Sequence, residues 1–222
     1  MKRSKKLFDS KVLLRTAHLD VFELSAEPEF LFVFFGGSGI DEEEYFQRSR
    51  TVVPVFDHVL DEVQVVPMTF LYVTSPFDVP LLRFAAQPAL AEEWNRHVLS
   101  ELLEPWDGLP YFLASFSGGA ALAFHGIHEP KLCIGGAAMG FDGLGARFLK
   151  PDHWRDPLRF YCGFADLVCN HPANRSVIDE LVCREQAEVF QLRTGSHRLA
   201  DYTTEDCLGR EIKHAHRLAC SG

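Results

Sequence analysis

Short, strongly apolar runs alternate with amphipathic segments along most of this chain. The run at 30–35, Phe-Leu-Phe-Val-Phe-Phe, contains no polar residue. Further apolar runs that are rich in strand-forming residues lie at 68–74, 111–114, 132–136, 159–163 and 187–193. Near-continuous apolar strands are typical of a parallel sheet that is covered on both faces. Two more segments, 12–17 and 19–24, alternate enough to predict two opening strands joined by a turn.

Between these runs, apolar residues recur at helical spacing. Pro88 opens a segment in which Leu90, Trp94, Val98 and Leu102 lie on one helical face. Asp41 and the acidic residues after it predict a helix start, and the same helix is expected to break before Pro54 and to resume to about residue 62. Two later stripes of apolar residues predict helices around 177–182 and 208–219. The alternation predicts an α/β fold with a mostly parallel central sheet and helices on both faces.

The stretch 111–126 carries the clearest chemical signal. An apolar strand pattern meets the sequence Ser115-Phe116-Ser117-Gly118-Gly119, and a helical run of small residues follows at once. This is the layout of a nucleophile elbow, in which a serine on a tight strand-to-helix turn is flanked by small residues. Ser117 fits the central position, whereas Ser115 would place a leucine where a small residue is needed. The alternative is a Ser/Gly-rich loop that only joins a buried strand to a helix.

An acid and a histidine follow later strands. Asp166 comes after the strand at 159–163, and His197 comes after the strand at 187–193. The order serine, aspartate, histidine is the order found in α/β-hydrolases. Asp142 is the rival acid because it also follows a strand, and each of these side chains could instead be an ordinary loop residue.

The sequence resembles the α/β-hydrolase superfamily from about residue 12 to residue 219. Four stretches carry the resemblance: Phe-Phe-Gly-Gly at 34–37, Leu-Ala-Ser-Phe-Ser-Gly-Gly at 113–119, Gly-Phe-Ala-Asp at 163–166 and Gly-Ser-His at 195–197. The chain departs from the family at Phe35, where a histidine is frequent, and at Ser115, where a glycine is frequent. Neither departure removes a catalytic group, and the resemblance identifies no subfamily.

The resemblance implies a three-layer fold without a large cap domain and a serine hydrolase mechanism without a cofactor. Ser117 would be the nucleophile, His197 its base and Asp166 the group that orients the imidazole. The backbone N–H groups of Gly37 and Gly118 would form the oxyanion hole. The expected reaction is cleavage of a carboxylic ester through an acyl-enzyme, with an acyl-thioester as the next candidate substrate. A non-catalytic ligand-binding protein with the same fold is the alternative from another class.

The family's usual cap insertion point lies between residues 138 and 158, where the chain has room for one short helix. We therefore expect a shallow, open site that favours short acyl groups or acyl groups carried on a larger partner. Five apolar side chains are candidates for contacting the acyl chain, although they could simply pack on the core: Phe77, Phe141, Leu144, Phe148 and Trp154.

Composition and charge narrow the class of protein. The chain has 222 residues, of which 47% are hydrophobic, and we expect one domain over residues 1–222. The net charge of −9 argues against a nucleic-acid partner. The basic residues near the start predict a flexible N-terminal tail over residues 1–10.

The sequence lacks clear signals for membrane insertion, secretion, metal binding and nucleotide binding. No apolar run is long enough for a membrane span and no signal peptide is evident, so we expect no membrane association. The six cysteines are irregularly spaced and lie mostly in apolar segments, which indicates reduced thiols and a cytoplasmic location. His125 and His128 have no further ligands at metal spacing, so no metal site is expected. The glycine-rich nucleotide-binding motifs are absent from the sequence. A nucleotide-binding protein is therefore the weaker interpretation of the alternating strand and helix patterns.

Overall fold

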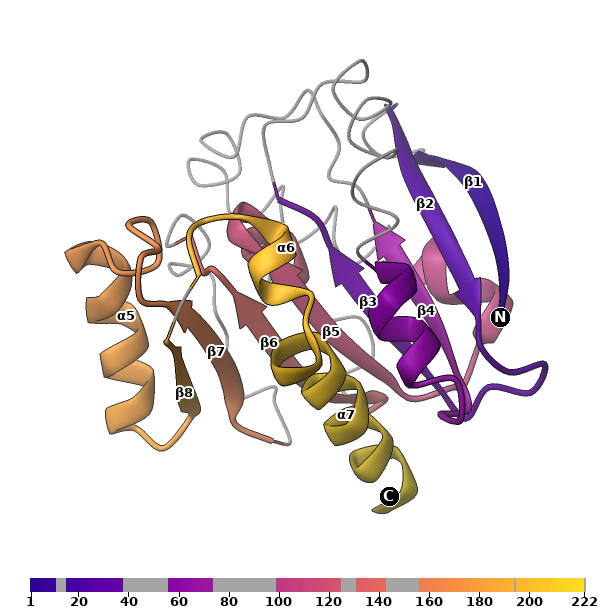
Figure 1. Cartoon of the computed structure of the whole chain (residues 1–222). Helices are drawn as coiled ribbons and strands as arrows, with labels where there is room; N and C mark the ends of the chain where they lie inside the picture. The colour runs from indigo at the N-terminus through magenta and orange to yellow at the C-terminus, as the bar shows by residue number, and fades with distance from the viewer. Residues whose placement is uncertain are drawn as a thin grey trace.

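The structure, a computed structural model, describes residues 1–10, 15–37, 56–73, 99–124, 131–142, 156–193 and 195–221. Its centre is an eight-stranded sheet with the order β1-β2-β4-β3-β5-β6-β7-β8 (Figure 1). The strands are β1 (Lys2–Ser10), β2 (Arg15–Glu23), β3 (Phe30–Phe35), β4 (Met68–Val73), β5 (Tyr111–Phe116), β6 (Cys133–Met139), β7 (Leu158–Gly163) and β8 (Ala187–Leu192). β1 and β2 form an antiparallel hairpin, β2 is antiparallel to β4, and the pairings from β4 to β8 are parallel. The expected mostly parallel sheet is confirmed.

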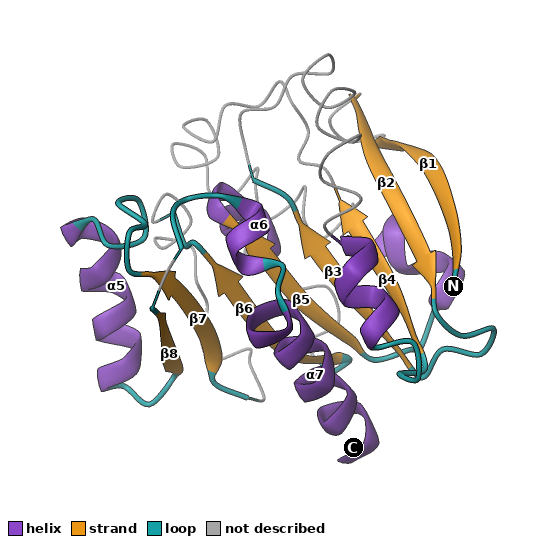
Figure 2. Cartoon of the chain, viewed as in Figure 1, coloured by secondary structure: helices purple, strands orange, loops and turns teal. Residues whose placement is uncertain are grey.

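Helices cover both faces of this sheet (Figure 2). A helix at 56–62, α6 (Leu199–Tyr202) and α7 (Arg210–Ser221) contribute to one apolar cluster. A helix at 99–103, α4 (Ala120–Ala123) and α5 (Pro172–Cys183) contribute to a second cluster. The two clusters share no residue, because each belongs to one face of the sheet. The three-layer α/β architecture is therefore confirmed.

Strand β3 shows why its apolar run has no interruption. Phe30, Phe32 and Phe34 belong to the cluster that contains α7, whereas the residues between them belong to the other cluster. Successive side chains of a strand point to opposite faces, and here both faces are packed. All six residues are fully buried. Phe32 also stacks on Phe70 and Phe112 of the neighbouring strands, with ring centroids 5.5 and 5.1 Å apart.

The expected flexible tail at residues 1–10 is wrong, because residues 2–10 form the edge strand β1. The basic residues of β1 lie opposite acidic residues of β2. Lys2 forms an ion pair with Glu23 at 3.2 Å, and Arg3 forms one with Asp20, also at 3.2 Å. Opposite charges across an antiparallel pair stabilise the ladder, and charged residues on an edge strand disfavour pairing with another chain. Strand β2 runs without a break over residues 15–23, so the turn expected between residues 17 and 19 is wrong.

The remaining elements match the sequence pattern to within a few residues where the structure describes them. The resumed helix is present at 56–62, and the helix expected after Pro88 is described only from residue 99. The last helix opens with a π-helical turn at Glu205–Gly209 and continues as α7. Among the described residues, no helix is both long and apolar enough to cross a membrane.

Candidate active site

Ser117 lies at the point where β5 ends and the following helix begins. A single 3₁₀ turn, Ser117–Gly119, joins β5 to α4. Ser117 has a φ of 52°, in the left-handed region that non-glycine residues rarely adopt. Such a conformation costs about 1–3 kcal/mol and persists only where the surrounding structure enforces it.

Close packing of the backbone enforces this turn. A Cβ on Gly119 would lie 2.5 Å from the carbonyl oxygen of Gly36 and 2.6 Å from that of Phe35. The start of α4 therefore packs directly against the end of β3, and only glycine leaves room for this contact. A Cβ on Gly37 would lie 3.4 Å from the Cβ of Ser117, so Gly37 lies immediately beside the serine.

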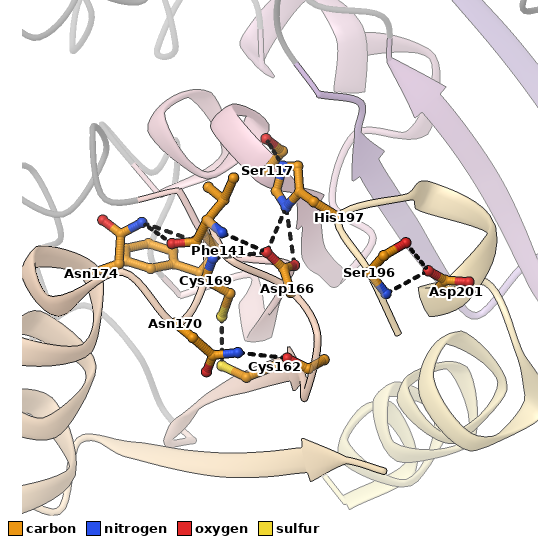
Figure 3. A network of polar contacts seen from close by, with 12 residues as sticks. Ser117, Phe141, Cys162, Asp166, Cys169, Asn170, Asn174, Ser196, His197 and Asp201 are labelled. Carbon is orange, nitrogen blue, oxygen red and sulfur yellow. Dashed lines mark hydrogen bonds and ion pairs between the residues drawn. The ribbon is translucent and has the colours of Figure 1, made fainter. Parts of the chain in front are cut away.

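His197 connects the serine to a buried carboxylate (Figure 3). Its Nε2 lies 2.8 Å from Ser117 Oγ, and its Nδ1 lies 3.0 Å from each carboxylate oxygen of Asp166. With Nδ1 donating to the carboxylate, a neutral imidazole has Nε2 free to accept the serine proton. The ring of Phe116 stacks on the imidazole with centroids 5.1 Å apart and further restricts its orientation.

Asp166 is fully buried and surrounded by hydrogen-bond donors. Its Oδ1 accepts from the backbone N–H groups of Val168 at 3.0 Å and Cys169 at 2.9 Å. Its Oδ2 accepts from the hydroxyl of Tyr202 at 2.5 Å. Burial by itself raises the pKa of this carboxyl, but the hydrogen bonds from His197, Tyr202 and the Cys169 backbone outweigh it and hold the pKa below its usual value. Asp166 is therefore an anion at neutral pH.

Tyr202 is a residue of this site that sequence reasoning missed. Its hydroxyl donates to Asp166 and accepts from the backbone N–H of Gly163 at 2.9 Å. Burial and the adjacent carboxylate raise the pKa of this phenol far above its ordinary value, so it stays a proton donor. Tyr202 sits on the short helix α6 in a segment without a recognisable motif. Only the tertiary structure brings it to Asp166.

The loops that carry the aspartate and the histidine are joined to each other. The N–H of Ala165 donates to the carbonyl of Gly195 at 3.0 Å, and Gly195 has a φ of 116° that suits glycine. Ser196 donates from its backbone N–H and its hydroxyl to Asp201 Oδ2, at 2.8 and 2.9 Å. These bonds fix the chain on the N-terminal side of His197.

Comparison with known proteins gives results at the level of structure only. No family model matches the sequence, and no curated protein matches it. Among solved structures, the enterobactin esterase of Shigella flexneri is 15% identical with a TM-score of 0.66, covering all of this chain and 60% of its own. A protein from Xanthomonas campestris, described as an α/β serine hydrolase without a lid, is 13% identical with a TM-score of 0.60, covering all of this chain and 95% of its own. A dienelactone hydrolase from Anabaena variabilis is 15% identical with a TM-score of 0.55, covering all of this chain and 99% of its own.

This chain has the α/β-hydrolase fold. In that fold the carboxyl ends of the parallel strands form one edge of the sheet, where ligands usually bind. Ser117 follows β5, Asp166 follows β7 and His197 follows β8, so all three lie at this edge. Asp166, and not its rival Asp142, is the carboxylate that contacts the imidazole.

Of the five residues expected to contact an acyl chain, the structure describes one. Phe141 is fully buried and packs edge-on against Phe160 in the core, with centroids 5.0 Å apart, so it offers no surface to a substrate. The other four, Phe77, Leu144, Phe148 and Trp154, lie outside the described residues, as do His125 and His128.

Replacing Tyr202 with phenylalanine is expected to lower the free energy of unfolding by about 1.5–3 kcal/mol at pH 7, the usual worth of a hydrogen bond to a charged group. Asp166 has a lower pKa in the folded state than in the unfolded state. Its ionisation therefore stabilises the fold above the unfolded pKa, and this contribution is lost as the pH falls through the folded pKa. The substitution removes part of that contribution.

Denaturant unfolding of both proteins across the acid range checks this prediction. The difference between them should shrink below about pH 4, the ordinary carboxyl range. A remainder should persist because the Gly163 N–H also loses its acceptor. A difference that is constant with pH would show that Tyr202 does not act on the ionisation of Asp166.

Proposed function

We propose that this protein is a serine hydrolase that cleaves a carboxylic ester through an acyl-enzyme on Ser117. The observation that carries the proposal is the chain of contacts from Ser117 Oγ to His197 Nε2 at 2.8 Å and from His197 Nδ1 to Asp166 at 3.0 Å. A nucleophile within reach of a base that a third group orients is the arrangement required for acyl transfer.

In the first half of the reaction, His197 Nε2 accepts the Ser117 proton as Oγ attacks the ester carbonyl. Asp166 stabilises the imidazolium that forms, and it stays ionised because its pKa is low. The tetrahedral intermediate collapses, His197 gives its proton to the departing alkoxide, and the alcohol leaves. In the second half, His197 takes a proton from water as the water attacks the acyl-serine carbonyl. The second tetrahedral intermediate collapses, His197 returns the proton to Ser117 Oγ, and the acid leaves.

The oxyanion needs two donors beside Oγ, and the N–H groups of Gly37 and Gly118 are the candidates. Gly118 directly follows the nucleophile in the 3₁₀ turn, and Gly37 lies against the Ser117 side chain. Their lack of side chains leaves the backbone accessible to a substrate. Loss of one such donor typically costs about 3 kcal/mol of transition-state stabilisation.

An oxygen ester is favoured over a thioester by the names of the structural neighbours. The set includes the enterobactin esterase and a ferulic acid esterase, which is 12% identical with a TM-score of 0.60. The same residues would hydrolyse a thioester by the same steps, with a thiolate as the leaving group. Neither possibility involves a cofactor.

Covalent labelling with a fluorophosphonate separates a hydrolase from a non-catalytic protein of the same fold. We expect one label per chain on the peptide that contains Ser117, and no label on heat-unfolded protein. A panel of p-nitrophenyl esters and acyl-thioesters of increasing chain length then measures kcat/KM for each leaving group and acyl length. A folded protein that takes up no label and hydrolyses no member of the panel would contradict the proposal.

A further inference from the structure

Three side chains with metal-binding atoms converge on the side of the molecule away from Ser117. Glu29 immediately precedes β3, whereas His216 and Cys220 are four residues apart on α7. Residues with this spacing lie on the same face of a helix. Figure 1 shows α7 running from α6 toward the edge at which the parallel strands begin, which is the edge opposite the one occupied by Ser117.

The donor atoms are close together. Glu29 Oε2 lies 4.0 Å from His216 Nε2 and 4.0 Å from Cys220 Sγ, and all three donor atoms lie within 4.8 Å of one another. Zinc bonds of about 2.0–2.3 Å place tetrahedral ligands roughly 3.3–3.7 Å apart. Small side-chain rotations would therefore bring the three atoms onto one ion.

We propose that Glu29, His216 and Cys220 bind a zinc-class divalent metal ion. Thiolate, imidazole and carboxylate are the three ligand types that zinc uses in proteins, whereas magnesium and calcium prefer all-oxygen sites. Coordination replaces the S–H bond of Cys220 with a metal–sulfur bond, and the thiol proton passes to solvent. A water molecule would complete the tetrahedron.

The surroundings favour this geometry. The ring of Phe30 stacks on the imidazole of His216, with centroids 6.1 Å apart and planes 17° apart, and Nε2 is the atom that faces Glu29. The backbone N–H of Glu29 donates to the carbonyl of Pro67 at 2.7 Å, which anchors the carboxylate's main chain. The side chain of Glu29 is 58% exposed and that of His216 34% exposed, so an ion reaches the site from solvent without any opening of the fold.

Bound metal would connect the last turns of α7 to the start of β3. It would act on the stability of the fold and not on the reaction, because the residues proposed for catalysis lie at the opposite ends of the strands. A ligand that binds only the folded state raises the unfolding temperature, and the rise grows with the logarithm of the free ligand concentration once that exceeds Kd. The spacing of residues along the sequence does not reveal this site, because Glu29 lies almost the whole chain away from His216 and Cys220.

The test uses the full chain after reduction and dialysis against a chelator. This protein is titrated with Zn²⁺ in competition with a metal indicator. We expect one high-affinity ion per chain and a rise in the thermal midpoint. Glu29→Gln, His216→Ala and Cys220→Ser should each weaken binding by at least about tenfold, the lower end of what losing even an outer-shell partner costs. Cys183→Ser, which changes another exposed cysteine, is the matched control and should bind normally.

Cobalt(II) supplies a signature that a structural effect would not reproduce. The protein should show a thiolate-to-cobalt charge-transfer band that Cys220→Ser abolishes and Cys183→Ser retains. Cys220→His keeps a zinc ligand on the same helical face and should bind Zn²⁺ without that band. Folded protein without saturable Zn²⁺ binding would overturn the proposal. So would a Zn²⁺ affinity in all three ligand variants that equals the affinity of the wild type. Fluorophosphonate labelling should be the same with and without Zn²⁺, so the outcome is independent of the proposed hydrolase activity.

Discussion

Replacing Ser117 with alanine is expected to lower kcat for ester hydrolysis by roughly six orders of magnitude, as the loss of a serine nucleophile does in other hydrolases. The variant loses the Oγ that lies 2.8 Å from His197, and within the described ranges no other hydroxyl contacts that imidazole. Fluorophosphonate labelling should disappear at the same time. Alanine should also be tolerated structurally, although the left-handed φ of 52° remains unfavourable for any residue with a Cβ.

Ser115→Ala is the matched control, because this serine lies two residues earlier, near the end of β5. Ser115 is fully buried, and its hydroxyl has no hydrogen-bond partner in the described part of the chain. Removing an unsatisfied buried hydroxyl should leave stability unchanged or slightly raised. Activity should remain near that of the wild type. Undiminished turnover in the Ser117 variant, or loss of turnover in the Ser115 variant, would move the nucleophile or reject the mechanism.

Asp166→Asn is expected to lower kcat by about 10⁴-fold while preserving the fold. Oδ1 accepts two backbone N–H groups, from Val168 and Cys169, so the amide oxygen must keep that position. The amide NH₂ then takes the place of Oδ2 and donates to Nδ1 of His197. This favours the tautomer with its proton on Nε2, which is unable to accept the proton of Ser117.

The control for this prediction is Asp142→Asn, which changes the rival acid. We expect a small effect on kcat because the carboxylate in contact with the imidazole belongs to Asp166. Stopped-flow or steady-state measurement of kcat for one activated ester compares the two variants. If Asp142→Asn proves the more damaging, the acid acts from the loop after β6.

The sequence by itself was sufficient to predict the parallel strands of the sheet and to name the candidate catalytic residues. The apolar run at 30–35 is short, rich in aromatic residues and followed by two glycines, which favours a strand packed on both faces, so its position follows from local composition. The elbow could be recognised because its pattern of small residues lies within a few positions of Ser117. The contact that requires Gly119 is not local, since it is made with the carbonyls of Phe35 and Gly36. Asp166 and His197 could be named because each follows a recognisable strand.

Contacts between segments that are distant in the sequence were decided only by the tertiary structure. The basic residues at the start resemble a solvated tail until β2 places acidic residues opposite them. Tyr202 lies in no motif, yet its hydroxyl reaches Asp166 across 36 positions and, with His197 and the Cys169 backbone, helps to hold the pKa of that carboxyl below its usual value. Phe141 is an apolar residue in the segment expected to line the site, but its side chain is buried in the core.

The same holds for the cluster of Glu29, His216 and Cys220. His216 and Cys220 are close along α7, but only the fold brings Glu29 to them. The physical reason is common to all of these cases. Hydrophobic periodicity and turn sterics act over a few residues, so they can be read from the sequence. Charge pairing, buried hydrogen bonds and ligand clusters depend on which surfaces the sheet order brings together. That order became known here only from the folded chain.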